Sequence, residues 1–171
     1  DHVGDGKKFG IKVNYSDDGK NLIGTGGAVK KAFPFLGENF FVLYGDSYLN
    51  INYSELYNTF KKSNLSSLMS IYKNNNKYDK SNVEVLNKNL IYYNKNIKNS
   101  KMTHIDYGVS ILSKKLFNNF NDYTKFDLSD VFLMAAENKI LSGFEVYKRF
   151  YEIGSFTGLK EFKDYLSSKG N

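Results

Sequence analysis

The chain has 171 residues, 41% of them hydrophobic and 16% aromatic, which is typical of one globular domain with a real core. It contains no cysteine, which excludes disulfides and Cys-based metal sites, and its only histidines are His2 and His104. A bound metal would therefore be held by oxygen ligands, which favours Mg²⁺ or a similar hard cation. No apolar run approaches the roughly 18 residues of a membrane span, and we expect a cytoplasmic protein without a membrane partner.

The net charge of +6 raises the hypothesis of a nucleic-acid partner. The lysines, however, are spread along the whole chain, and the single arginine is Arg149. Nucleic-acid surfaces usually gather Lys and Arg on one face. The sequence therefore favours a protein without a nucleic-acid partner, and binding through net charge alone would weaken steeply with salt.

Residues 11–16 (IKVNYS) alternate apolar and polar side chains and predict a strand. Residues 24–33 predict a Gly-rich loop that runs into a short helix closed by Pro34. The apolar run that follows predicts a buried strand over residues 39–46. The first third of the chain thus alternates strand and helix.

Residues 53–62 predict a helix that turns Leu56, Tyr57 and Phe60 inward. Residues 65–73 (LSSLMSIYK) predict the next strand. Both elements continue the alternation of strand and helix.

The polar run at residues 74–82 predicts a mobile loop. Residues 83–95 have the pattern of a hairpin that turns at residues 87–89. A strand carrying a glycine is predicted over residues 104–112, and residues 113–120 are predicted to be helical.

Residues 127–138 give the clearest helical pattern, with Asp127 or Ser129 as its cap. Residues 142–155 predict a strand that ends in an acid and a glycine, and residues 157–169 predict a closing amphipathic helix. The apolar face of that helix holds Leu159, Phe162, Tyr165 and Leu166. With no internal repeat and no long linker, residues 1–171 predict one α/β domain built on a layered sheet.

One candidate site is the run Gly24, Thr25, Gly26 and Gly27. Glycines let backbone N–H groups approach a ligand closely, and the helix that follows offers its positive N-terminal end. A Gly-rich loop that only starts a helix is the alternative, and the run alone does not separate the two. It lacks the Walker Gly-Lys-Ser/Thr and the GxGxxG spacing, which excludes both nucleotide motifs.

Two acids stand at the ends of predicted strands. Asp46 follows the run FFVLYG, and Glu152 lies between a strand and a glycine in FYEIGS. An aspartate in such a place is either a turn residue or a ligand. The two acids are more than a hundred positions apart and can meet only through the fold, where they would make a paired oxygen site for Mg²⁺ against phosphates.

The segments GTGGAVKKAFPFLGENFFVLYGDSYL, MTHIDYGVSIL and RFYEIGSFTGLKEFKDYL occur in this order and at these spacings. Together they resemble the sugar-1-phosphate nucleotidyltransferases, most of all the mannose-1-phosphate and heptose-1-phosphate guanylyltransferases. The resemblance covers nearly the whole chain. It implies a Rossmann-like, mixed but mostly parallel sheet flanked by helices.

The resemblance also implies roles for the candidate residues. Residues 24–27 would pack against the nucleobase and ribose, and Asp46 would be one magnesium ligand. Glu152 would be the second, at a position where the family has Asp, so the ligand here is longer by one methylene.

The sugar side of the implied site falls on three further residues. Lys95 aligns with the lysine that contacts the sugar phosphate, although the neighbouring Glu and Pro of that motif are absent in YYNKN. Asp106 and Gly108 align with the motif that touches sugar hydroxyls.

The family also begins with a strand and a Gly-rich signature, containing Gly-Thr-Arg and later Pro-Lys, that wraps the triphosphate. No such signature occurs in this chain, which opens at Asp1. We therefore expect an N-terminally incomplete domain that lacks its first βα units, on the order of 60 residues. Such a sheet would expose an unpaired edge.

The implied reaction is transfer of a nucleotidyl group from an NTP, with GTP favoured, to a sugar 1-phosphate, with Mg²⁺ as cofactor. It needs no Ser or Cys nucleophile and depends on positioning and charge neutralisation. The alternative is a non-catalytic module that binds a nucleotide or a sugar phosphate, because the triphosphate-binding signature is absent. A homo-oligomer is possible in either case.

Overall fold

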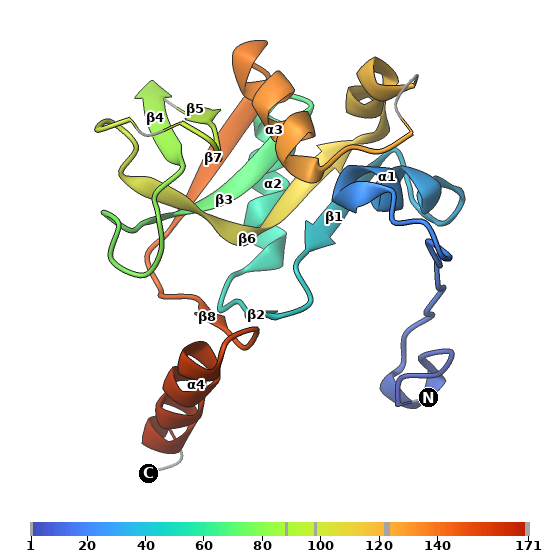
Figure 1. The fold of residues 1–171 in the computed structure, drawn as a ribbon, viewed down its shortest axis with the longest axis horizontal. Helices are drawn as coiled ribbons and strands as arrows, with labels where there is room; N and C mark the ends of the chain where they lie inside the picture. The colour runs from blue at the N-terminus through green and yellow to red at the C-terminus, as the bar shows by residue number, and fades with distance from the viewer. Residues whose placement is uncertain (1, 88, 98, 122–123, 170–171) are drawn as a thin grey trace.

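The computed structural model describes residues 2–87, 89–97, 99–121 and 124–169. Its centre is a six-stranded sheet (Figure 1). The strands lie in the order β1 (Asn39–Leu43), β6 (His104–Ser113), β3 (Ser67–Lys73), β7 (Leu141–Val146), β5 (Leu90–Tyr93) and β4 (Val83–Asn87). The helices are α1 (Gly24–Lys31), α2 (Tyr53–Ser63), α3 (Leu128–Glu137) and α4 (Phe156–Lys169), with short 3₁₀ helices η1 (Lys7–Phe9), η2 (Phe33–Phe35) and η3 (Lys114–Phe120).

The direction of the strands differs from the expectation of a mostly parallel sheet. Among the described strands only β3 and β7 pair in parallel, whereas β6 runs antiparallel to both β1 and β3, and β5 antiparallel to both β4 and β7. One further antiparallel pair, Val83 with His104, joins β4 back to β6 and closes the sheet on itself. The mostly parallel prediction is wrong, because the apolar pattern of a strand indicates which faces are buried and not which way its neighbours run.

Helices cover both faces of the sheet. On one face Met69 of β3 belongs to the same apolar cluster as Phe132 of α3, and on the other Leu68 belongs to a cluster with Leu56 and Phe60 of α2. Successive residues of a strand point to opposite faces, so β3 is buried on both sides. The expected layered α/β arrangement is confirmed.

The predicted helix at residues 53–62 forms as α2, and its cap is the Asn52 side chain, which accepts from the N–H groups of Ser54 and Glu55. Leu56 and Phe60 are buried as predicted, but Tyr57 is 43% exposed. Its ring lies 6.3 Å from that of Phe41 on β1 instead of entering the core.

β1 was expected to be a buried strand and is instead an edge strand. It pairs only with β6 among the described strands, and Phe40 is its single fully buried residue. Phe41 and Leu43 are 37% and 48% exposed. The apolar run correctly predicted a strand, but burial depends on the neighbours, which the run does not specify.

The strand predicted at residues 11–16 is absent. Residues 2–23 extend away from the sheet, with η1 as the one regular element described there (Figure 1). Ile11 and Tyr15 are 56% and 67% exposed. No described strand lies beside this segment, and a strand is not stable without a partner for its backbone groups.

The glycines of residues 24–27 also differ from the prediction, because they form the first turn of α1 rather than a loop before it. The single strand expected over residues 142–155 is divided into β7 and the short β8 (Tyr151–Glu152). β8 pairs with β2 (Ser47–Tyr48) in a separate two-stranded ribbon. This division brings Glu152 to a place that a continuous strand would not reach.

The remaining predicted elements form as strands and helices close to the expected bounds. β3, the β4–β5 hairpin, β6, α3 and α4 are confirmed, and residues 114–120 are helical as the 3₁₀ helix η3. Of the predicted hairpin turn at residues 87–89, Lys88 lies outside the described residues. Residues 74–82 form the expected loop, whose mobility stays a prediction. None of the described helices is long and apolar enough to cross a membrane.

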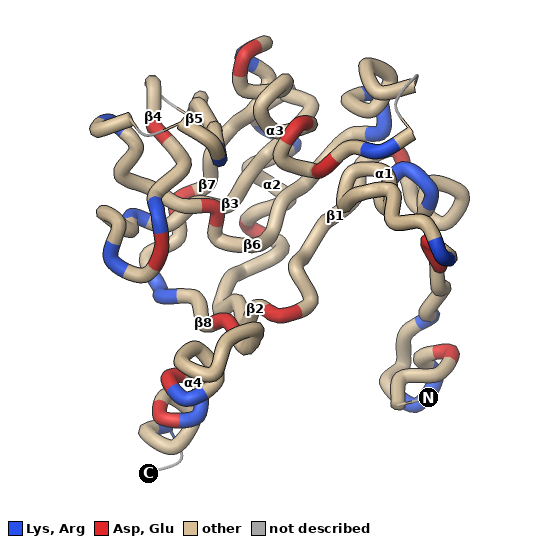
Figure 2. The backbone as a smooth tube through the Cα atoms, in the orientation of Figure 1, with Lys and Arg blue, Asp and Glu red and all other residues tan. Residues whose placement is uncertain are grey.

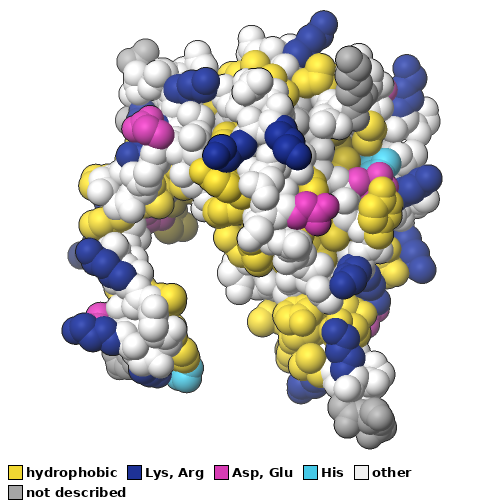
Figure 3. All heavy atoms as spheres, turned by 180° about the vertical axis from the view of Figure 1, so that it is seen from behind, with side chains coloured by type: hydrophobic (Ala, Val, Ile, Leu, Met, Phe, Trp, Pro, Cys, Tyr) yellow, Lys and Arg dark blue, Asp and Glu magenta, His cyan; other side chains and the backbone are white. Residues whose placement is uncertain are grey.

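The closing helix α4 projects from the body of the protein (Figure 1). Phe162 and Tyr165 place their rings against Tyr48 and Tyr151 of the β2–β8 ribbon. Hydrophobic side chains gather at the base of this helix (Figure 3). The rest of the predicted apolar face, Leu159 and Leu166, is 36% and 48% exposed.

Candidate functional site

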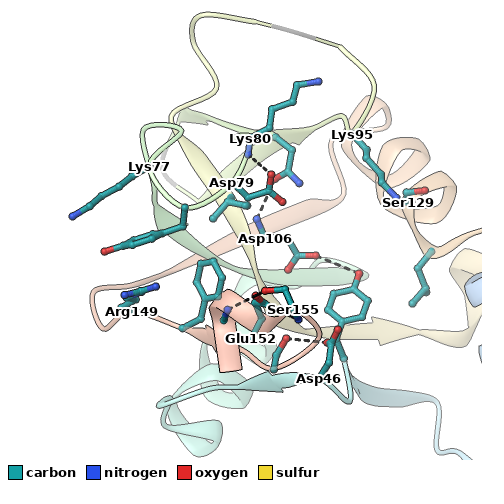
Figure 4. Close-up of a pocket in the computed structure, with 18 of the residues that line it drawn as sticks. Asp46, Lys77, Asp79, Lys80, Lys95, Asp106, Ser129, Arg149, Glu152 and Ser155 are labelled. Atoms are coloured by element: carbon teal, nitrogen blue, oxygen red, sulfur yellow. Dashed lines mark hydrogen bonds between the residues drawn. The ribbon is translucent and has the colours of Figure 1, made fainter. Parts of the chain in front are cut away.

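A cleft of about 1080 Å³ opens where the β2–β8 ribbon, loop 74–82, and the N-termini of α3 and α4 face one another. Charged side chains from all these segments point into it or stand at its rim (Figure 4). Among the described residues, lysines and the arginine are distributed over the fold, and one acid directly precedes β2 while another lies in β8 (Figure 2). The candidate residues that line this cleft include Asp46, Lys95, Asp106 and Glu152.

Asp46 and Glu152 meet in this cleft. Ser47 pairs with Glu152 in the β2–β8 ribbon, and the Ile153 N–H donates to the Asp46 carbonyl oxygen at 2.8 Å. A methyl group added to Gly154 would lie 3.0 Å from Asp46 Oδ2 and 3.4 Å from Glu152 Oε2, so the two carboxylates flank the same glycine. The fold thus brings together two acids that are far apart in the sequence.

The Glu152 carboxylate is held by Ser155. The Ser155 backbone N–H donates to Oε2 at 3.0 Å, and its hydroxyl donates to Oε1 at 2.5 Å. Hydrogen bonds to the charged form favour it, and the Ser155 hydroxyl above all lowers the pKa of Glu152. Asp46 accepts a longer hydrogen bond, at 3.3 Å, from the hydroxyl of Ser47.

The donor set at this corner fits magnesium. No group of three or more His, Asp or Glu side chains gathers around one point in the described part of the chain. Mg²⁺ is usually held by one or two carboxylates, with water and substrate phosphates completing its shell. Asp46 and Glu152 supply such a pair, and both are oxygen donors, as the absence of cysteine requires.

Asp106 stands deeper in the cleft on β6. It accepts from the Gly108 N–H at 2.9 Å, and the Tyr44 hydroxyl lies 3.5 Å away. Burial raises the pKa of Asp106 to about 6, although both hydrogen bonds act in the opposite direction. Gly108 itself is buried and has a φ of 108°, a conformation that strongly favours glycine.

Lys95 follows β5 and lines the cleft, as a contact with a sugar phosphate requires. It is exposed, and its side chain points toward Ser129 in the first turn of α3 (Figure 4). Lys95, Asp46, Asp106 and Glu152 therefore all face one cavity.

Residues 24–27 are placed differently from these four. The N–H of Thr25 donates to the Asp127 carboxylate at 3.0 Å, and those of Gly26 and Gly27 donate to the Phe126 carbonyl at 3.1 and 3.2 Å. A methyl group at Gly24 or Gly26 would collide with Phe126. The glycines are thus explained by close packing of α1 against the start of α3, and only Thr25 of the four lines the cleft.

Several residues in the cleft were not singled out from the sequence. Ser155 had a local signal, since it occupies the position of a helix N-cap before α4. Arg149 had none: its guanidinium lies 4.0 Å from the ring centre of Tyr78 and 4.7 Å from that of Tyr151, and it forms an ion pair with Glu161. Such contacts join loop 74–82, β8 and α4, and no local pattern reveals them.

Comparison with known proteins agrees with the fold. No protein-family model matches the chain. A D-glycero-alpha-D-manno-heptose 1-phosphate guanylyltransferase from Campylobacter jejuni subsp. jejuni serotype O:2 is 32% identical over 123 residues, which are 71% of this chain and 53% of that protein. The chain therefore spans about half the length of this curated relative.

Two solved structures show the same architecture. A protein assigned as a glucose-1-phosphate thymidylyltransferase from Bacillus anthracis has a TM-score of 0.79 at 16% identity, over 93% of this chain and 67% of its own. The inositol-1-phosphate CTP transferase from T. maritima has a TM-score of 0.74 at 22% identity, over 96% of this chain and 71% of its own. At these identities the likeness shows the fold alone.

The fold is that of the nucleotidyltransferases, a mixed sheet covered by helices. By sequence, 71% of the chain is similar to a sugar-1-phosphate nucleotidyltransferase.

Proposed function

We propose that the chain carries the metal and sugar-phosphate side of an enzyme that transfers a nucleoside monophosphate from an NTP to a sugar 1-phosphate. The products are an NDP-sugar and pyrophosphate. The observation that carries this proposal is the pairing of Asp46 and Glu152 across Gly154 in a cleft of about 1080 Å³. The similarity to a heptose 1-phosphate guanylyltransferase supports the same reaction.

In the proposed reaction a phosphate oxygen of the sugar 1-phosphate attacks the α-phosphorus of the NTP. A new P–O bond forms, the bond from the α-phosphorus to the bridging oxygen breaks, and pyrophosphate leaves with that electron pair. No covalent enzyme intermediate is needed. The protein contributes by positioning the two phosphates and neutralising their charge.

Five residues of the cleft have a part in this scheme. Asp46 and Glu152 would hold Mg²⁺, which neutralises phosphate charge when it is bound. Lys95 would pair with the phosphate of the sugar. Asp106 would accept hydrogen bonds from sugar hydroxyls, and Thr25 would face the nucleoside.

We propose GTP and a heptose 1-phosphate as the first substrates to test, because the relative that is 32% identical over 123 residues is a heptose 1-phosphate guanylyltransferase. The solved structures of this fold include proteins whose names refer to thymidylyl and CTP transfer. The base is therefore best decided by a screen of all four NTPs.

A second candidate is binding without turnover. None of the described residues 2–23 lines the cleft, so this segment contributes no group to a triphosphate there. In that case the chain would bind a nucleotide or a sugar phosphate and release no pyrophosphate.

The test is a pyrophosphate-release screen of four NTPs against heptose, mannose and glucose 1-phosphates, in Mg²⁺. Release with one pair of substrates, lost on addition of EDTA, supports the enzyme. Calorimetric binding of a nucleotide or sugar phosphate without release supports the second candidate. Neither release nor binding with any pair would contradict both.

A further inference from the structure

The Glu152 carboxylate is held by a residue outside its own strand. Ser155 donates its backbone N–H to Oε2 at 3.0 Å and its hydroxyl to Oε1 at 2.5 Å, so a single residue occupies both oxygens. In Figure 4 Ser155 stands directly over Glu152, with the Asp46 side chain below. The direction of the carboxylate is therefore set from the side of α4.

The Ser155 hydroxyl is itself oriented. Its oxygen accepts from the Gly158 N–H at 2.9 Å, which is the hydrogen bond of a helix N-cap. The hydroxyl therefore accepts from Gly158 and donates its proton to the Glu152 carboxylate. One side chain thus both starts α4 and orients the acid.

The packing around the carboxylate leaves little freedom. A methyl group on Gly158 would overlap the Glu152 carboxyl group and its backbone oxygen. On the opposite side, Gly154 separates Glu152 from Asp46. Without a fixed partner, the long and flexible Glu152 side chain would sample several rotamers.

We propose that Ser155 is a positioning residue that holds Glu152 opposite Asp46, so that both carboxylates serve one divalent cation. This inference rests on the metal site of the proposed function. It explains how a glutamate, with one methylene more than aspartate, is kept at a fixed place: the first turn of α4 supplies the restraint. It also makes the placement of α4 part of the metal site.

The test measures Mn²⁺ affinity by electron paramagnetic resonance, which needs no turnover. Ser155→Gly removes the hydroxyl and keeps a residue that helix N-caps tolerate. We expect its Mn²⁺ affinity to fall about tenfold, the lower end of the effect of losing a partner that orients a metal ligand. Ser155→Thr restores the hydroxyl and is expected to bind within about twofold of the unchanged chain.

The matched control is Ser168→Ala at the far end of α4, where the hydroxyl bonds only to the Tyr165 carbonyl among the hydrogen bonds described. It should leave Mn²⁺ affinity unchanged. A crystal structure of the Ser155→Gly variant should show the Glu152 carboxylate displaced from Gly154 and Asp46.

Unchanged Mn²⁺ affinity in Ser155→Gly, or a Glu152 carboxylate that stays in place, would overturn the inference. So would an unchanged chain that binds no Mn²⁺. The expected Mn²⁺ results without any pyrophosphate release would leave the positioning role standing and remove the proposed reaction. Normal pyrophosphate release by the unchanged chain, combined with normal Mn²⁺ affinity in Ser155→Gly, would leave the proposed reaction standing and remove the positioning role.

Discussion

The cleft contains two acid sites whose ionisation is set in opposite directions. At the β2–β8 ribbon, hydrogen bonds from Ser155 lower the pKa of Glu152. On β6, burial raises the pKa of Asp106 to about 6 in spite of donors from Gly108 and Tyr44. A carboxylate with a lowered pKa stays charged and available to a cation, whereas Asp106 titrates close to neutral pH. The contrast teaches that the surroundings, not the type of side chain, divide these acids into different roles.

The largest expected effect comes from breaking the charged site. Asp46→Ala should reduce kcat/KM for pyrophosphate release by at least about 100-fold, because several kcal/mol of phosphate charge neutralisation would be lost. Asp164→Ala, an exposed acid of α4 that does not line the cleft, is the control. Equal activity of the two variants would contradict the assignment of Asp46.

The next effect comes from crowding the same site. Gly158→Ala introduces a methyl group that overlaps Glu152, and we expect about tenfold weaker Mn²⁺ binding and a loss of roughly 1–3 kcal/mol in the free energy of unfolding. Gly37→Ala is the matched control, because its methyl group would meet only the Asn39 carbonyl, at an ordinary 3.6 Å. Paramagnetic resonance and urea unfolding measure the two quantities. Similar behaviour of both variants would show that Glu152 is not confined.

The third prediction concerns the buried site and its pH dependence. The pKa of Asp106 is raised to about 6 in the folded chain, so its contribution to stability is fully present below about pH 4 and is lost as pH rises through 6. Asp106→Asn does not titrate. Relative to this variant, the unchanged chain should lose no more than about 3 kcal/mol of unfolding free energy between pH 4 and pH 7.5.

Urea unfolding at several pH values checks this prediction. The difference between the unchanged chain and Asp106→Asn should change steadily between about pH 4 and pH 6 and stay constant above that range. A difference that is constant with pH would mean that Asp106 is not perturbed in the folded chain.

The smallest effect comes from a single hydroxyl at the buried site. Tyr44→Phe removes the donor that lies 3.5 Å from Asp106, a long hydrogen bond. Because that donor favours the charged form, its loss should raise the pKa of Asp106 further, as carboxyl carbon NMR would show. The free energy of unfolding should change by less than about 1 kcal/mol. A lower pKa of Asp106 in the variant would contradict this arrangement.

Much of the fold could be predicted wherever a pattern acts over a few residues. Leu56 and Phe60 mark the buried side of α2, and Asp127 marks the start of α3, because helix periodicity and capping are local. Tyr57 was misplaced because it lies at the margin of the apolar stripe, where contact with Phe41 on a neighbouring strand decides its exposure. Helical periodicity alone could not predict that Tyr57 is exposed while Leu56 and Phe60 are buried.

The residues of the candidate site were likewise predictable only in part from local sequence patterns. Asp46 and Glu152 could be selected because each acid stands at the end of a predicted strand, and the structure places both in one cleft. Residues 24–27 were selected by the general behaviour of Gly-rich helix starts, yet the backbone N–H groups of Thr25, Gly26 and Gly27 bond to Phe126 and Asp127. Those partners are about a hundred positions away, so no local sequence pattern could predict these hydrogen bonds.

The amino-acid sequence by itself determined the elements that depend on near neighbours: α2, α3, α4, the β4–β5 hairpin and the oxygen-only chemistry of any metal site. The tertiary structure alone decided the strand directions, the edge position of β1 among the described strands and the absence of a strand at residues 11–16. It also decided that Ser155 meets Glu152 and that Glu152 meets Asp46. The physical reason is range, since hydrophobic periodicity and caps act within a few residues, whereas pairing and burial depend on segments that only folding brings into contact.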